Sequence, residues 1–64
     1  MSHSTTIAFL NNRIRAVQAD IEAIEAQIAS DPPETTDQLL MLREAQNAYR
    51  GVITNLKAAI DCCE

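Results

Sequence analysis

The strongest constraint on this chain is a run of apolar residues in its first half that are spaced alternately three and four apart. In an α-helix this spacing brings the side chains onto one stripe, whereas a half-buried strand needs every second residue. The stripe continues without an exception through Ile7, Leu10, Ile14, Val17, Ile21, Ile24 and Ile28. It predicts a helix over about residues 6–29 that packs on another helix as in a coiled coil.

A second line with the same spacing follows the opposite side of this helix. Its large member is Phe9, and alanines make up most of the rest. The other members are Asn12, Ala16, Ala19, Ala23 and Ala26. Because alanine is the best helix former, this line can be an ordinary surface that faces solvent. The alternative is a smooth face on which another helix packs closely, with Phe9 as its anchor.

Two adjacent prolines, Pro32 and Pro33, interrupt the helical pattern. Proline cannot donate a helical hydrogen bond and restricts the residue before it, so the pair predicts a turn at residues 30–34. Thr35, with Gln38 three residues later, forms a capping box that favours a second helix from Thr35 onward. Asp31, which is followed directly by proline, is the alternative start.

The second half holds more apolar residues than one stripe can accommodate. A seam with alternating spacing consists of Leu42, Ala45, Tyr49, Val52, Leu56, Ala59 and Cys63. An adjacent line adds Leu39, Ile53 and Ile60, while Leu40 and Met41 widen the face near its beginning. We therefore predict a second helix over about residues 35–61 with an unusually wide apolar face.

Together these elements predict an all-α fold, an antiparallel αα-hairpin with coiled-coil packing, in which residues 1–64 form one unit. The first few residues are expected to be disordered. The chain has 64 residues, and chains below roughly 70–80 residues rarely bury enough apolar surface to be stable alone. We therefore expect self-association or a partner protein to complete the core.

The surplus apolar side chains are the predicted partner-binding residues. An exposed apolar patch commonly marks an interaction site. The candidates are Leu39, Leu40, Met41, Ile53, Ile60 and Phe9. The alternative is that a second copy of the chain covers the same surface in a homo-oligomer.

The basic residues of the second half, Arg43, Arg50 and Lys57, are spaced by seven and therefore form one line along the helix. In an antiparallel hairpin Arg43 comes near Glu22 and Glu25. We expect a solvated flank that sets the orientation of the two helices. A docking stripe for an acidic partner is the alternative.

Residues that commonly carry catalysis are scarce in this chain. The single histidine is His3, so neither a catalytic histidine pair nor a zinc site can be assembled. Glu22 and Glu25 are interpreted as a solvated pair. We predict no enzymatic activity, no metal site and no cofactor. Cys62 and Cys63 are adjacent and fit free thiols in a reducing cytoplasm.

The charge balance and the hydropathy pattern exclude two further classes of partner. Five basic residues against nine acidic ones give a net charge of −4, which disfavours nucleic-acid binding. No apolar run reaches the roughly 18 residues of a membrane span, and the beginning lacks the basic and apolar regions of a secretion signal. The sequence therefore predicts a cytoplasmic protein that acts by protein–protein contact.

Residues 37–56 also carry a resemblance to a known family. Large apolar residues follow Gln38, a pair of Ala48 and Tyr49 comes next, and a small residue, Gly51, precedes an apolar run that ends at Leu56. This segment resembles the second helix of the small needle chaperones of bacterial type III secretion. The large apolar residues that carry the match near its beginning are Leu39, Met41 and Leu42.

The resemblance implies a cytoplasmic hairpin that packs on a TPR-like co-chaperone and helps to keep a needle subunit unpolymerised before export. It implies that the hairpin core and the co-chaperone face come from Leu39, Met41, Leu42, Tyr49 and Leu56.

Two alternatives stay open. Asp31-Pro32, Leu39-Leu40, Tyr49 and Lys57 also resemble the turn and C-terminal helix of needle subunits themselves. The second alternative is a homodimeric four-helix bundle that serves as a scaffold or regulator.

Overall fold

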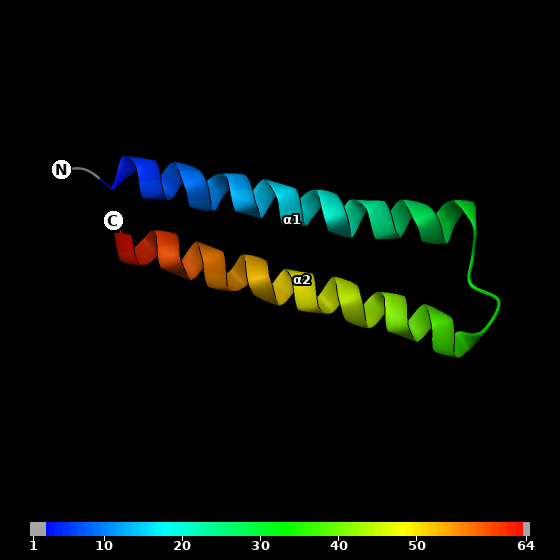
Figure 1. Cartoon of the computed structure of the whole chain (residues 1–64). Helices are drawn as coiled ribbons and strands as arrows, with labels where there is room; N and C mark the ends of the chain where they lie inside the picture. Colours follow the sequence, from blue (N-terminus) through cyan, green and yellow to red (C-terminus); the bar gives the residue numbers. More distant parts are fainter. Residues whose placement is uncertain (1–2, 64) are drawn as a thin grey trace.

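The computed structural model describes residues 3–63, which form two long helices joined by a short turn. Helix α1 spans Ser4–Ser30 and helix α2 spans Thr36–Cys63. The helices lie side by side and run in opposite directions, so the beginning of α1 and the end of α2 lie at the same end of the molecule (Figure 1). The prediction of an all-α helical hairpin is confirmed, and residues 3–63 contain no strand.

The helices extend slightly further than their sequence patterns predict. Helix α1 begins two residues earlier, because the Ile7 amide donates a hydrogen bond of 2.8 Å to the His3 carbonyl and closes an additional turn. The expected disorder is therefore wrong for Ser4, while Met1 and Ser2 lie outside the described residues.

The turn is closed by hydrogen bonds at both of its ends. At the end of α1, the Asp31 amide donates to the Gln27 carbonyl at 2.8 Å. At the start of α2, the Gln38 amide donates to the Thr35 hydroxyl at 3.1 Å, and the Glu34 amide donates to Gln38 Oε1 at 3.1 Å. Thr35 is therefore the cap of α2, as the capping box predicts, and Asp31 is not.

The stripe on α1 faces α2, as its regular spacing predicts. Ile14 and Val17 are buried at the centre of the hairpin, while the other members of the stripe are half-buried. The alanines of the second line, on the opposite side, are exposed together with Phe9. The two sides of α1 are therefore as different in the structure as they are in the sequence.

The predicted seam of α2 is right at every second member and wrong by one position at the three members between them, Ala45, Val52 and Ala59. Val52 is 41% exposed, whereas its neighbour Ile53 is buried in the core and Gln46 is completely buried. The line that faces α1 has the same alternating spacing and consists of Leu39, Leu42, Gln46, Tyr49, Ile53, Leu56, Ile60 and Cys63. This line buries larger apolar side chains than the predicted one, at the cost of placing a glutamine in the seam.

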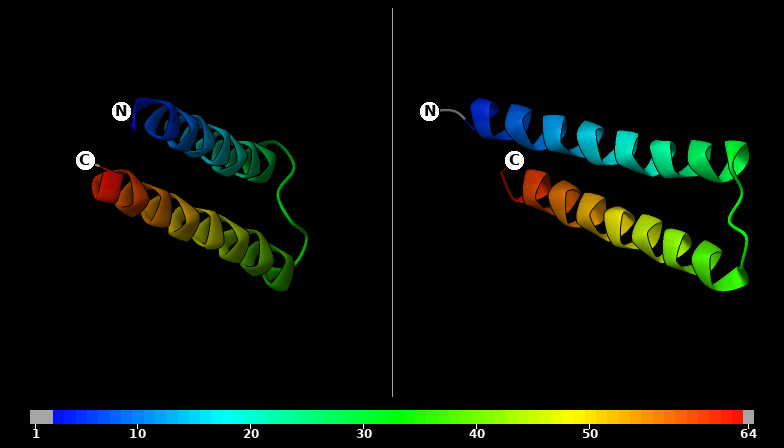
Figure 2. Two further views of the ribbon diagram at one scale, coloured as in Figure 1. Left: turned by 60° about the vertical axis from the view of Figure 1, so that its left-hand side comes forward. Right: turned by 45° about the vertical axis from the view of Figure 1, so that its right-hand side comes forward.

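The register between the helices follows from two contacts. Ile14, Val17 and Ile53 form the buried core, and the Gln46 side-chain amide donates to the Ile21 carbonyl at 3.1 Å. Ile14 therefore lies opposite Ile53, and one heptad further on, Ile21 lies opposite Gln46. From this central region the helices diverge toward the turn in every view (Figures 1 and 2).

The resulting molecule is elongated and exposes a large surface for its mass. Its dimensions are 52 × 17 × 9 Å, and its accessible surface is 4731 Å². A compact monomer of 7.0 kDa typically exposes about 4,000 Å². The hairpin therefore exposes about 700 Å² more than a typical monomer of its size.

Candidate functional site

One broad face of the hairpin carries most of the exposed apolar side chains, and we call it the open face. On α1 the residues of this face, from Phe9 to Ala23, recur three or four apart, and Gln27 continues the same line. On α2 it includes Met41, which lines one groove together with Gln27 and therefore lies on the same side. The open face comprises Phe9, Arg13, Ala16, Asp20 and Ala23 of α1 and Met41, Ala45, Ala48, Val52, Asn55, Ala59 and Cys62 of α2.

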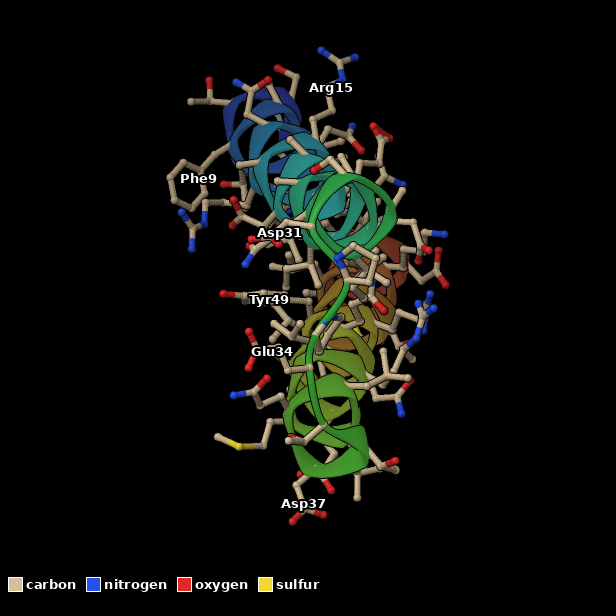
Figure 3. The ribbon with its side chains drawn as sticks, turned by 90° about the vertical axis from the view of Figure 1, so that its right-hand side faces the viewer. Phe9, Arg15, Asp31, Glu34, Asp37 and Tyr49 are labelled. Carbon is tan, nitrogen blue, oxygen red and sulfur yellow. The ribbon has the colours of Figure 1, made fainter. Side chains whose placement is uncertain are left out.

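A view along the helix axes shows on which side of the hairpin the open face lies. Figure 3 shows Phe9 and Tyr49 projecting from the same side of the hairpin, while Arg15 projects from another. Phe9 is 62% exposed and Met41 is 69% exposed, so neither side chain belongs to the hairpin core. Their exposure costs free energy in water, which another apolar surface would recover on contact.

The structure separates the predicted partner-binding residues into two groups. Phe9, Leu40 and Met41 are exposed, with Leu40 exposed by 54%. Ile53 is buried in the core, while Leu39 and Ile60 are half-buried on the line that faces α1. The placement of Ile53 on an outward surface is therefore corrected, because this side chain fills the space between the two helices.

Leu40 and Met41 lie on different sides of α2, although they are adjacent in sequence. Consecutive residues of an α-helix point about 100° apart. Met41 continues the open face, whereas Leu40 precedes Asn47 by seven residues and therefore shares a flank with it. Leu40 and Met41 therefore do not form one continuous patch, and a single partner helix cannot pack on both.

A groove lies at the turn end of the open face, where the helices diverge. Its volume is about 490 Å³, and Met41 and Leu42 supply its apolar walls. Its polar walls come from Gln27, Asp31, Glu34 and Gln38, and the two prolines of the turn complete it. The groove therefore combines two acidic side chains with two large apolar ones.

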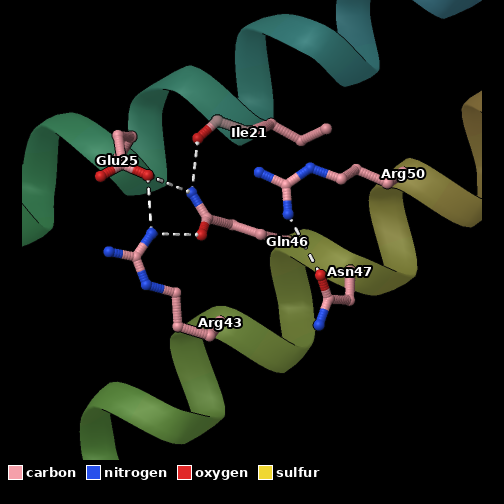
Figure 4. Close-up of polar contacts among 6 residues, drawn as sticks. All are labelled: Ile21, Glu25, Arg43, Gln46, Asn47 and Arg50. Atoms are coloured by element: carbon pink, nitrogen blue, oxygen red, sulfur yellow. Dashed lines mark hydrogen bonds and ion pairs between the residues drawn. The ribbon is translucent and has the colours of Figure 1, made fainter.

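The opposite flank of the hairpin carries a polar network that joins the two helices (Figure 4). Arg43 Nη1 lies 2.7 Å from Glu25 Oε1, in the only ion pair within residues 3–63, and donates to Gln46 Oε1 at 2.9 Å. Gln46 Nε2 donates to Glu25 Oε1 at 3.2 Å and to the Ile21 carbonyl. The expected proximity of Arg43 to Glu25 is confirmed.

The network perturbs one titratable group. The hydrogen bond that the Arg43 guanidinium donates lowers the pKa of the Glu25 carboxyl group, and the hydrogen bond from Gln46 lowers this pKa further. Both effects favour the charged form of Glu25. The network therefore holds the two helices in one register, with the negative charge of Glu25 on α1 and the positive charge of Arg43 on α2.

Sequence reasoning missed Gln46, although its position carried a signal. This residue lies seven residues after Leu39 and seven before Ile53, so it falls on the line of large apolar residues. A single polar residue in an apolar heptad line commonly specifies register or orientation. The hydrogen bonds to Ile21, Glu25 and Arg43 satisfy its buried amide group.

Other kinds of site have little support among the described residues. Within residues 3–63, no three histidine, cysteine, aspartate or glutamate side chains gather closely enough to hold a metal ion. Both cysteines are free thiols, with Cys62 exposed and Cys63 half-buried. Neither helix has a stretch of the length and hydropathy that crossing a bilayer requires.

The chain matches no protein-family model, no curated protein and no solved structure.

Proposed function

We propose that this protein is a non-catalytic, cytoplasmic helical hairpin that binds an amphipathic helix of another protein through its open face. The observation that carries the proposal is the exposure of Phe9, Met41 and Val52 on a chain whose buried apolar core consists of Ile14, Val17 and Ile53. Large exposed apolar side chains on a small domain are typical of interaction surfaces.

Physical considerations favour a helix as the bound element. The open face is long, because it runs along two antiparallel helices of a molecule 52 Å in length, and it contains many alanines. Alanines allow a third helix to approach closely, and the larger Phe9 and Met41 side chains fit between the ridges of such a helix. The groove at the turn adds Leu42 as a second large apolar lining residue beside Met41.

Among proteins of this kind, a needle chaperone of type III secretion is the role we propose. A needle subunit that polymerises through an amphipathic helix must have that helix covered before export. The hairpin fold and the resemblance of residues 37–56 support this role, with a TPR-like co-chaperone as the second partner. Leu40 offers an apolar position for a second contact, because it lies on a different side of α2.

Co-expression with a needle subunit and a TPR-type co-chaperone tests the proposal. The expected result is a soluble complex of the three chains, in which the needle subunit does not polymerise. Met41→Glu should release one partner, because a buried carboxylate would replace an apolar contact. Gln18→Glu is the matched control, since Gln18 is exposed and precedes Glu25 by seven residues, which places it on the flank opposite the open face.

Leu40→Glu examines the second contact in the same experiment. If Leu40→Glu and Met41→Glu release different partners, the two sides of α2 bind different proteins. Retention of both partners by both variants would refute the assignment of these surfaces. If the wild-type protein forms filaments by itself, the chain is a needle subunit and the chaperone role is wrong.

A further inference from the structure

The open face carries a charge pattern that is complementary to itself. On α1 its charged residues are Arg13 and Asp20, one of each sign, and on α2 it has none. Neither Arg13 nor Asp20 has an ion-pair partner within residues 3–63. They are two helical turns apart on the same line, which is too far for the two side chains to pair within one helix.

We propose that the open face binds a second copy of this chain, with α1 packed antiparallel on α1 of the second copy about a two-fold axis at Ala16. In this register Arg13 lies opposite Asp20 of the second copy, and symmetry repeats the pair on the other side of the axis. Phe9 lies opposite Ala23 of the second copy, so a large side chain meets a small one. The proposal concerns the surface on which the proposed function rests, but it requires no other protein.

The charges select this register over its neighbours on the same line. An axis at Arg13 would place the two arginines of the dimer together, and an axis at Asp20 would place the two aspartates together. Like charges opposite each other disfavour an interface. The register at Ala16 is the one that forms two opposite-charge pairs.

The second helix is compatible with the same axis. Because Ile14 lies opposite Ile53, Val52 lies at nearly the same height along the hairpin as Ala16. One axis therefore passes close to both residues, and the exposed Val52 side chains of the two copies meet near it. The open-face residues of α2 are uncharged and Arg13 balances Asp20 on α1, so the net charge of −4 comes from residues outside the open face.

The area of the exposed surface also fits a dimer. A stable interface removes about 800 Å² of surface from each partner. The hairpin exposes about 700 Å² more than a typical monomer of its mass, which is close to that requirement. The resulting dimer is a four-helix bundle in which each helix runs antiparallel to both of its neighbours.

A charge-swap experiment tests this geometry by native mass spectrometry and sedimentation of the purified chain. A reductant is included so that Cys62 and Cys63 cannot cross-link the copies. The wild type should be a dimer. Arg13→Asp and Asp20→Arg should each dimerise at least about tenfold more weakly, because each variant places like charges together twice.

An equimolar mixture of the two variants should form a heterodimer, because both pairs then have opposite charges again. Arg15→Asp is the matched control and should dimerise like the wild type, since Arg15 projects from a different side than Phe9 (Figure 3). Circular dichroism of each variant checks that helicity is retained. The mixture remains informative even if one variant alone is less helical.

Three outcomes would overturn the proposal: a monomeric wild type at about 100 μM, loss of the dimer in Arg15→Asp, or a mixture that does not form heterodimers. Both proposals use the open face, so a partner helix would bind only after the dimer dissociates. The two can still be distinguished, because this experiment uses the purified chain alone. A monomeric wild type that binds a needle subunit would refute the dimer and keep the chaperone role. A wild type that dimerises and binds neither candidate partner would support the dimer and refute the chaperone role.

Discussion

At the scale of single residues, Gln46 determines how the two helices are aligned. Its amide is completely buried, and its donors and acceptor are used by Ile21, Glu25 and Arg43. An apolar side chain could fill the same space without these hydrogen bonds. Gln46 therefore contributes mainly to the choice of one register, because a shifted pairing would leave its amide unsatisfied.

Gln46→Glu should destabilise the hairpin at neutral pH by about 1–3 kcal/mol. The new carboxylate cannot donate to the Ile21 carbonyl and is repelled by Glu25. Urea denaturation followed by circular dichroism measures the change, and acidification should restore part of the loss. Gln46→Leu is the comparison, for which we expect an unfolding free energy close to that of the wild type. A loss in Gln46→Leu as large as in Gln46→Glu would contradict a role in register alone.

Glu25 makes stability depend on pH through its lowered pKa. A carboxyl whose pKa is lower in the folded state stabilises the fold above its unfolded pKa, near 4.5. This contribution is lost as the pH falls through the lower folded value. Thermal melting between neutral pH and about pH 3 should therefore show an acid-dependent decrease that Glu25→Gln reduces.

Glu22→Gln serves as the control for that measurement, because Glu22 is exposed and has no ion-pair partner among the residues that the structure describes. Its melting curve should follow that of the wild type as the pH falls. An equal effect of both substitutions would assign the acid dependence to net charge instead of the Glu25–Arg43 pair.

At the scale of the elements, each helix is defined by its ends and by the side that it buries. The Thr35 hydroxyl caps α2, whereas His3 makes no side-chain cap for α1. The beginning of α2 is therefore the better defined of the two. The two prolines of the turn prevent the helices from joining into one.

Thr35→Ala should lower the unfolding free energy by about 0.5–2 kcal/mol, because the Gln38 amide loses its acceptor. Thr35→Ser retains a hydroxyl and should have a much smaller effect. Amide hydrogen exchange at the beginning of α2 identifies the site of the change. Uniformly faster exchange along both helices in Thr35→Ala would indicate a global effect instead of a lost cap.

The buried and exposed sides of the helices should respond differently to truncation. Ile14→Ala removes a buried side chain and should cost about 2–5 kcal/mol. Leu40→Ala should cost less than about 1 kcal/mol, because Leu40 is exposed by 54%. Chemical denaturation at one fixed protein concentration measures both values. Equal and large losses would mean that Leu40 belongs to the core.

At the scale of the whole molecule, the hairpin exposes a large surface and buries little apolar volume. Its buried apolar core consists of Ile14, Val17 and Ile53, placed near the middle of a molecule 52 Å long. The ends depend on half-buried side chains, and the helices separate toward the turn. Additional burial on the open face would therefore stabilise the entire hairpin.

The melting temperature of the wild type should rise with protein concentration, because a dimer is favoured by mass action. Arg13→Asp should show a weaker dependence over the same concentrations, and Arg15→Asp should behave like the wild type. Differential scanning calorimetry at several concentrations measures this dependence. A wild-type melting temperature that does not change with concentration would argue against self-association.

The sequence by itself determined both helices, the break between them and the side of α1 that is buried. Each of these rests on a local or repeating signal: the prolines of the turn, the Thr35 cap and a single apolar stripe on α1. The proximity of Arg43 to Glu25 followed from the antiparallel arrangement. The exposure of Phe9 followed from its position opposite the stripe.

Only the tertiary structure decided which side of α2 faces α1. The sequence of α2 offers two overlapping lines with the same spacing, one through Val52 and one through Ile53. Local propensity cannot choose between them, because both are helical and both are apolar. The choice depends on the total burial against α1 and on whether Gln46 finds hydrogen-bond partners there. Rotation of α2 toward Ile53 leaves Val52 and Met41 exposed, and this rotation creates the open face.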